Sequence, residues 1–139
     1  MANRARELRF AVDLAPSGEL REENGSALAL PAEWTPEHLL LAALIRCSLA
    51  SLGYHAERAG LEIARASGST RALVTKRESD GRYAVVESDV ELAVEIESEP
   101  GADELVELLA KAERDCFVGA SLNEKPRYSW TVNGRPAGA

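Results

Sequence analysis

The sequence has no basic block and no long apolar run. Its net charge is −7, and Asp and Glu are spread along all 139 residues, a pattern that gives a solvated surface and disfavours nucleic acid or anionic lipid as partners. The longest apolar run, Leu39 to Ile45, is far shorter than the ~20 residues that cross a bilayer. Residues 1–20 hold no apolar run suited to a signal peptide. We therefore expect a cytoplasmic protein with neither a nucleic-acid nor a membrane partner.

The sequence also lacks the motifs of several kinds of site. It contains no CxxC or HxxxH pair. His38 and His55 flank Cys47 at ~12–14 Å along a helix, too far for one ion to bridge them, and we interpret both as helix-surface or terminal residues. No nucleophile elbow surrounds a serine, and the glycines are too scattered for a phosphate loop. We expect no metal and no cofactor.

Cysteine is scarce, and the two cysteines are the most informative residues. Cys47 follows the apolar run that starts at Leu39, and Cys116 closes an amphipathic segment that starts at Glu104. In the cytoplasm a cysteine pair is more often catalytic, redox-sensing or inert than a permanent crosslink. A free cysteine usually packs as a small hydrophobe. Two cysteines, each on the apolar face of its own helix, can however meet in the core as a redox pair, and both interpretations stay open at this point.

The first part of the chain predicts short strands and one long helix. A chain of 139 residues with 45% hydrophobic content predicts one domain over 1–139. Residues 8–14 are expected to form a strand, and two short strands are expected to meet at Asn24-Gly25. Thr35 as N-cap and Pro36 at the first helical position predict a helix. This helix should reach Tyr54 or Ala59, stop at Gly60 and be buried on most sides.

The second part predicts a hairpin, a helix and a last strand. Residues 61–76 and 82–96 are expected to pair as antiparallel strands, with Asp80-Gly81 as a two-residue turn. Apolar residues recur at helical spacing over 104–116, so a second helix should carry Cys116 on its apolar stripe and pack against the first. Residues 127–134 are expected to form an edge strand before a frayed terminus. The fold class is therefore α+β with antiparallel sheets.

A reactive Cys47 needs a partner. Burial in apolar surroundings raises the pKa of a thiol, and only the thiolate is nucleophilic. Arg46 is adjacent in sequence but points ~100° away around the helix. The activating group must therefore come from elsewhere in the chain.

Two segments together resemble the OsmC/Ohr family of osmotically inducible and organic-hydroperoxide-resistance proteins. The first is 35–47, Thr-Pro-Glu-His-Leu-Leu-Leu-Ala-Ala-Leu-Ile-Arg-Cys. The second is 116–122, Cys-Phe-Val-Gly-Ala-Ser-Leu, followed by the closing strand 128–134, Tyr-Ser-Trp-Thr-Val-Asn-Gly. The order of elements also agrees over nearly the whole chain. Phe117 after the second cysteine and Arg46 before the first differ from the two best-known branches and favour a less characterised OsmC-like branch.

The resemblance implies a fold with antiparallel sheets around a buried central helix, an intertwined homodimer and a thiol peroxidase activity on organic hydroperoxides. It makes Cys47 the peroxidatic thiolate and Cys116 the resolving thiol of an intramolecular disulfide, which a dithiol such as a lipoylated protein would reduce. Glu37, ~15 Å from Cys47 along a helix, would orient an arginine against the thiolate. The candidate arginines are Arg4, Arg6, Arg9 and Arg21.

Three functions remain open from the sequence. The first is this cysteine-based peroxidase. The second is a non-catalytic OsmC-like dimer whose apolar pocket binds a small lipid-like molecule. The third is an acidic structural or interaction domain with incidental cysteines.

Overall fold

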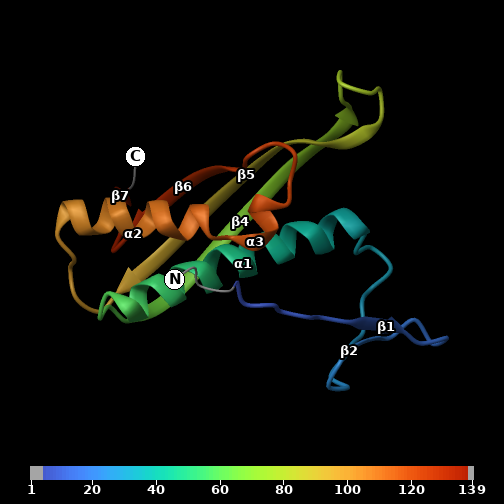
Figure 1. Cartoon of the computed structure of the whole chain (residues 1–139), viewed down its shortest axis with the longest axis horizontal. Coiled ribbons are helices and arrows are strands. Elements are labelled where there is room, and N and C mark those ends of the chain that lie inside the picture. The colour runs from blue at the N-terminus through green and yellow to red at the C-terminus, as the bar shows by residue number, and fades with distance from the viewer. Residues whose placement is uncertain (1–4, 138–139) are drawn as a thin grey trace. The chain divides into compact units, whose positions relative to one another are not determined.

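A computed structural model describes residues 5–137 and divides the chain into two compact units, one up to Thr35 and one from Pro36 onward (Figure 1). The first unit holds three antiparallel strands in the order β1-β2-β3. These strands are β1 (Val12–Leu14), β2 (Leu20–Glu22) and β3 (Ala27–Leu28).

Two details of this first unit differ from the sequence prediction. The strand expected over 8–14 begins only at Val12, because the register with β2 ends at the pair Val12 and Glu22. The hairpin at Asn24-Gly25 exists, but its loop is longer than two residues. The Glu22 N–H donates to the Ser26 carbonyl across it at 3.0 Å, and Gly25 takes a φ of 93°, as in three-residue loops that end in a left-handed glycine.

The second unit begins with the long helix α1 (Pro36–Arg58), whose ends agree with the sequence prediction. Pro36 starts it because proline at the first helical position loses no hydrogen bond. At the other end Gly60 takes a φ of 74°, and the Leu61 N–H donates to the Ala56 carbonyl at 2.8 Å. These features are typical of a helix that ends at a left-handed glycine.

The strands of the second unit form one mixed sheet in the order β4-β5-β6-β7. Its strands are β4 (Ile63–Lys76), β5 (Tyr83–Ile96), β6 (Arg127–Val132) and β7 (Arg135–Ala137). β4 and β5 form the predicted antiparallel hairpin. Its loop is longer than the expected two-residue turn, since the Arg77 N–H donates to the Arg82 carbonyl at 2.9 Å and four residues lie between them.

Two sheet predictions are wrong. β6 runs parallel to β5, because α2 (Ala102–Arg114) and α3 (Phe117–Ala120) lie between them and carry the chain back across the sheet. β6 is also not an edge strand, because β7 pairs with it antiparallel. The connecting residues Asn133 and Gly134 take positive φ values of 51° and 80°, which makes this Asn-Gly pair the tight hairpin turn of the chain's end.

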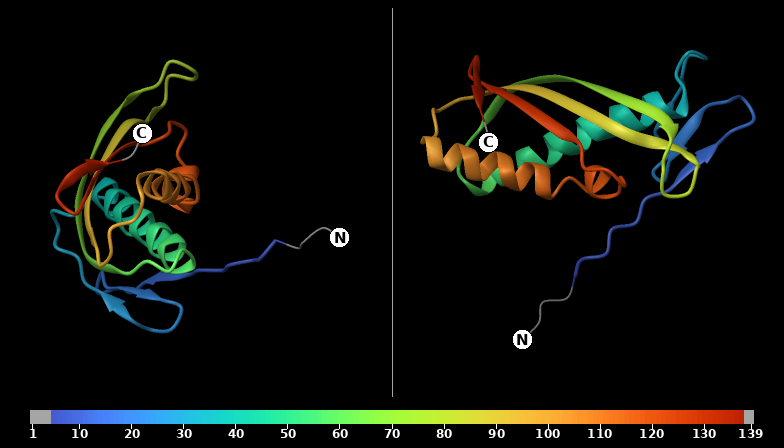
Figure 2. Two further views of the ribbon diagram at one scale, coloured as in Figure 1. Left: turned by 90° about the vertical axis from the view of Figure 1, so that its left-hand side faces the viewer. Right: turned by 90° about the horizontal axis from the view of Figure 1, so that it is seen from above.

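Both long helices lie on the same face of the four-stranded sheet, with α1 against β4 and against α2 (Figures 1 and 2). Along β5, alternate side chains from Ser88 to Ile96 are buried under the helices and the others face outward. The sheet side of the core is closed by Trp130 and Val132 of β6. The helical side contains Leu44, Leu52, Ala56, Leu108, Leu109 and Ala112.

α1 is long and apolar enough to cross a membrane by composition alone, which the length of its apolar run did not predict. Its buried residues include Leu44, Leu52 and Ala56, which belong to the core cluster of the second unit. Ser48 and Ser51 are buried as well, and the other residues of α1 are half-buried or exposed in the single chain. In the single chain α1 is therefore a core helix with one covered face, rather than a helix buried on most sides as its sequence predicts.

Candidate active site: a paired-thiol cluster

Cys116 lies in a different local structure from the one its sequence pattern predicts. α2 ends at Arg114, and the Asp115 N–H makes the last helical hydrogen bond to the Lys111 carbonyl at 3.0 Å. Cys116 itself has extended backbone angles, φ −76° and ψ 109°, and precedes α3. The second cysteine is therefore not on the stripe of a continuous helix but at the break between two helices.

The break still brings the two cysteines together. Cys47 is half-buried on α1, and its sulfur accepts a hydrogen bond from the Val118 N–H at 3.4 Å. Cys116 is 0% exposed, and its sulfur accepts from the Gly119 N–H at 3.4 Å. The two thiols lie near each other, and each influences the pKa of the other.

Two hydroxyl groups complete the surroundings of Cys116. Ser48, also 0% exposed, follows Cys47 on α1 and places its Oγ 3.6 Å from the Cys116 Sγ. The Tyr128 hydroxyl of β6 lies 2.9 Å from the same Ser48 Oγ. We call Cys47, Cys116, Ser48 and Tyr128 the paired-thiol cluster. It joins α1, the α2–α3 break and β6.

The cluster gives its two thiols opposite electrostatic environments. Burial raises the pKa of the Cys47 thiol above its ordinary value, and the Val118 N–H opposes this only in part. Burial acts in the same direction on Cys116, but hydrogen bonds from the Gly119 N–H, Ser48 and Cys47 outweigh it and hold the Cys116 pKa below its ordinary value. Within the single chain, the thiol that favours ionisation is therefore Cys116.

Glu37 is not part of this cluster. It is exposed in the first turn of α1, ~15 Å along the helix axis from Cys47. Of the candidate arginines, Arg6, Arg9 and Arg21 belong to the first unit, and Arg4 lies outside the described residues. The influences that set the Cys47 pKa come from burial, backbone amides and Cys116.

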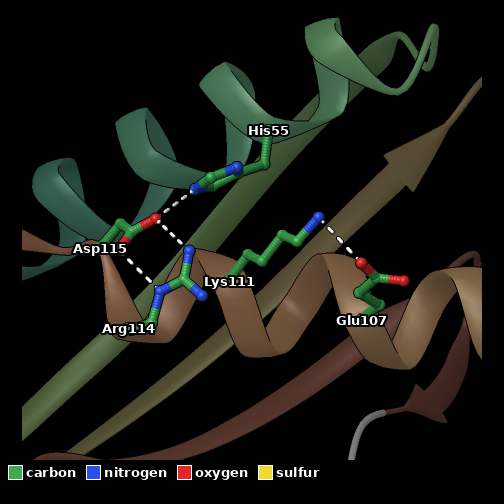
Figure 3. A network of polar contacts seen from close by, with 5 residues as sticks. All are labelled: His55, Glu107, Lys111, Arg114 and Asp115. Atoms are coloured by element: carbon green, nitrogen blue, oxygen red, sulfur yellow. Dashed lines mark hydrogen bonds and ion pairs between the residues drawn. The ribbon is translucent and has the colours of Figure 1, made fainter. Parts of the chain in front are cut away.

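An ion-pair chain fixes the residue beside Cys116 (Figure 3). The Asp115 carboxylate accepts from the His55 Nε2 at 2.8 Å and from the Arg114 guanidinium through two bonds of 2.9 Å. The Arg114 and His55 bonds lower the pKa of Asp115 to about 2. His55 is in the last turn of α1 as expected, but its side chain is only 11% exposed. It ties the end of α1 to the α2–α3 break and is not a surface residue.

A pocket of about 590 Å³ lies beside the paired-thiol cluster and shares Gly119 and Tyr128 with it. Its walls come from α2, α3 and the segment that leads to β6, and they are mainly apolar, with Glu113, Arg114 and Lys125 among the polar lining residues. Its volume is within the range of small-molecule sites.

Sequence reasoning found the two cysteines but missed Ser48, Tyr128 and the His55–Asp115 bond. Ser48 carried one signal, a hydroxyl next to Cys47 in a helix with few polar positions. Tyr128 is 80 residues from Ser48, and nothing local in the sequence links them. Among residues 5–137 no group of three or more His, Cys, Asp or Glu side chains could hold a metal ion.

The fold and the site define a class of α+β protein in which a core helix and a helix break bring two thiols together. Residues 29–131 match the family model described as OsmC-like protein, so the chain belongs to the OsmC family.

Solved structures show the same fold. An OsmC-like protein of unknown function from Vibrio cholerae has a TM-score of 0.70 at 16% identity, with 91% of this chain and 99% of that chain covered. An OsmC-like protein from Mycoplasma pneumoniae has a TM-score of 0.67 at 15% identity, with 93% and 99% covered. An organic hydroperoxide resistance protein from Elizabethkingia anophelis has a TM-score of 0.58 at 17% identity, with 93% and 98% covered. No curated protein matches the sequence.

Proposed function

We propose that this protein is a thiol-dependent peroxidase that reduces organic hydroperoxides through Cys47 and Cys116. The observation that carries the proposal is the proximity of a half-buried and a buried thiol, whose sulfurs accept hydrogen bonds from the neighbouring Val118 and Gly119 N–H groups. Membership of the OsmC family and the fold shared with a protein named for organic hydroperoxide resistance support it.

The proposed reaction uses the two thiols in turn. The Cys47 thiolate attacks the terminal peroxide oxygen, the O–O bond breaks, and the alkoxide takes a proton and leaves as an alcohol. The resulting Cys47 sulfenic acid is attacked by Cys116, the S–S bond forms, and hydroxide leaves and takes a proton to give water. A dithiol such as that of a lipoylated protein then reduces the disulfide by exchange. Cys47 is assigned the first step because it is the more accessible of the two sulfurs.

Cys47 needs a cation for this first step, because burial alone holds its pKa high. We propose that one of Arg4, Arg6, Arg9 and Arg21 supplies this cation in a homodimer and that Glu37 orients that arginine.

Exposed apolar side chains support dimer formation. In the first unit they include Phe10, 80% exposed, and in the second Leu73 and Val74 of β4. β4, moreover, pairs with one neighbour only in the described sheet. In such a dimer, residues 1–139 of each chain would form a single domain.

The test separates the two thiols. Cys47→Ser should abolish consumption of cumene hydroperoxide, whereas Cys116→Ser should allow one stoichiometric turnover and leave a sulfenic acid that dimedone traps. Glu37→Gln should slow the oxidation step without abolishing it, and Glu57→Gln, an exposed acid in the last turn of the same helix, is the matched control. Full activity in Cys47→Ser would end the peroxidase proposal.

A binding function is the second candidate, and the pocket beside the paired-thiol cluster favours it. In that case the mainly apolar walls would hold a small lipid-like molecule. Such a protein would bind a fluorescent fatty acid equally well with and without its cysteines and would consume no peroxide.

A further inference from the structure

Ser48 and Tyr128 form a short chain of hydroxyl groups that ends at the Cys116 sulfur. Tyr128 Oη lies 2.9 Å from Ser48 Oγ, which lies 3.6 Å from Cys116 Sγ. The Gly119 N–H reaches the same sulfur at 3.4 Å. A Cβ on Gly119 would stand 3.5 Å from both Cys116 Sγ and Tyr128 Oη. Gly119, the Cys116 sulfur and the Tyr128 hydroxyl are therefore close neighbours.

Each hydroxyl has a single hydrogen, and this decides how the chain is oriented. When Cys116 is a thiolate, its sulfur has no hydrogen, so the Ser48 hydroxyl donates to it and the Tyr128 hydroxyl donates to Ser48. Every hydrogen in the chain then has an acceptor. When Cys116 is a neutral thiol that donates to Ser48, Ser48 donates to Tyr128, and the acceptor left in the cluster for the Tyr128 hydrogen is the thiol sulfur of Cys116, which accepts only weakly. The geometry therefore suits the thiolate.

Tyr128 keeps its proton and stays a hydrogen-bond donor, because burial raises the pKa of its hydroxyl. The hydrogen bond with Ser48 lowers this pKa, but by less than burial raises it. Its ring is fixed by stacking on Trp130, with centroids 5.9 Å apart and planes 7° apart. The charged groups nearby are already paired. Asp115 bonds to His55 and Arg114, and Glu113 accepts from the Trp130 Nε1 at 2.9 Å. Among residues 5–137, the groups that surround the Cys116 sulfur are thus two hydroxyls, one backbone amide and the Cys47 thiol, rather than a cation.

We propose that Ser48, held by the positioning residue Tyr128, keeps Cys116 ionised, so that an oxidised Cys47 is resolved without waiting for Cys116 to lose its proton. This role rests on the proposed peroxidase function. In the resolving step the Cys116 thiolate forms the S–S bond, the S–O bond of the Cys47 sulfenic acid breaks, and the departing hydroxide takes a proton from solvent. Ser48 and Tyr128 keep their own protons throughout.

The first measurement needs no peroxide. In the Cys47→Ala background Cys116 is the single thiol, and its thiolate absorbance at 240 nm can be followed from pH 5 to 9 against the variant that lacks both cysteines. Absorbance reports ionisation even though Cys116 is fully buried. A hydrogen bond to a charged group changes an ionisation constant about tenfold or more. Ser48→Ala should therefore lower the ionisation constant of Cys116 about tenfold, and Tyr128→Phe should lower it less, since it acts mainly through Ser48.

Two matched controls remove the same atoms elsewhere. Ser51→Ala deletes a buried serine hydroxyl one turn along α1 that has no hydrogen-bond partner among residues 5–137, and Tyr83→Phe deletes the hydroxyl of an exposed tyrosine on β5. Both should leave the Cys116 titration unchanged. Tyr128→Phe keeps the ring on Trp130, so it reports on the chain even where Ser48→Ala disturbs the core.

The second measurement follows the reaction with both cysteines present. After one equivalent of cumene hydroperoxide, Tyr128→Phe should oxidise at the wild-type rate but form the disulfide several-fold more slowly, with more dimedone-trapped sulfenic acid. Titration curves of Ser48→Ala and Tyr128→Phe that coincide with those of the two controls would overturn the inference. An inert wild type with the titration shift intact would instead overturn the peroxidase proposal and leave the role of the hydroxyl chain in ionisation standing.

Discussion

Asp115→Asn tests whether the ion-pair chain beside Cys116 stabilises the fold. The carboxylate keeps a pKa of about 2 against an ordinary value of 3.8, a difference equivalent to about 2.4 kcal/mol. Its side chain is 39% exposed, and solvent screening of exposed ion pairs reduces this to about 1 kcal/mol. We therefore expect Asp115→Asn to lower the free energy of unfolding by about 1 kcal/mol at pH 7.

The pH dependence follows from the direction of the shift. A carboxyl whose pKa is lower in the folded state stabilises the fold above its unfolded pKa and loses that contribution as the pH falls through its folded pKa. The difference between wild type and Asp115→Asn should therefore be constant from pH 7 to about pH 5 and shrink between pH 4 and 2. Urea unfolding at several pH values measures it, with Glu124→Gln as an exposed control. No loss at pH 7, or a loss that persists unchanged at the lowest pH, would refute the reasoning.

Two further substitutions test the sheet and its contact with the helices. Gly68→Ala should cost about 1–3 kcal/mol of unfolding free energy, because the new Cβ would lie 2.5 Å from the Leu92 Cδ2. Gly53→Ala adds a Cβ that meets none of the described residues within 4 Å apart from its own helix backbone, so it should be neutral or stabilising. Equal losses of unfolding free energy in the two variants would contradict the packing described. Trp130→Phe should lower the free energy of unfolding by about 1–3 kcal/mol, since it removes the 2.9 Å hydrogen bond to Glu113. An unchanged free energy of unfolding, measured by chemical denaturation, would count against that bond.

The sequence predicts α1 and the long hairpin well because strong local signals specify them. Pro36 and Gly60 fix the ends of α1, and alternating side chains identify β5. It fails where non-local pairing decides the structure. The parallel pairing of β6 with β5 depends on the crossover through α2 and α3, and the Asn133-Gly134 turn becomes a hairpin only because β7 pairs with β6.

The site shows the same division. Both cysteines stand out by scarcity, and their meeting follows from two apolar segments that share one core. The helical spacing of apolar residues up to Cys116 nevertheless predicts the wrong backbone conformation for Cys116. Periodicity cannot show that the helix ends before this residue and that the backbone is extended at Cys116. Ser48 and Tyr128 meet across 80 residues, and the His55–Asp115 bond across 60. Such contacts come from packing and leave no local pattern in the sequence.

Counting thiols during oxidation tests the central claim most directly, that Cys47 and Cys116 act as one redox pair. Reduced protein is mixed with one equivalent of cumene hydroperoxide in a stopped-flow instrument, and free thiols and intact mass are measured before and after. The account predicts that both thiols disappear together, with the loss of two hydrogen atoms per chain, and that a dithiol restores both. Thiols that stay free, or a single oxygen added to one cysteine while the other remains reduced, would contradict it.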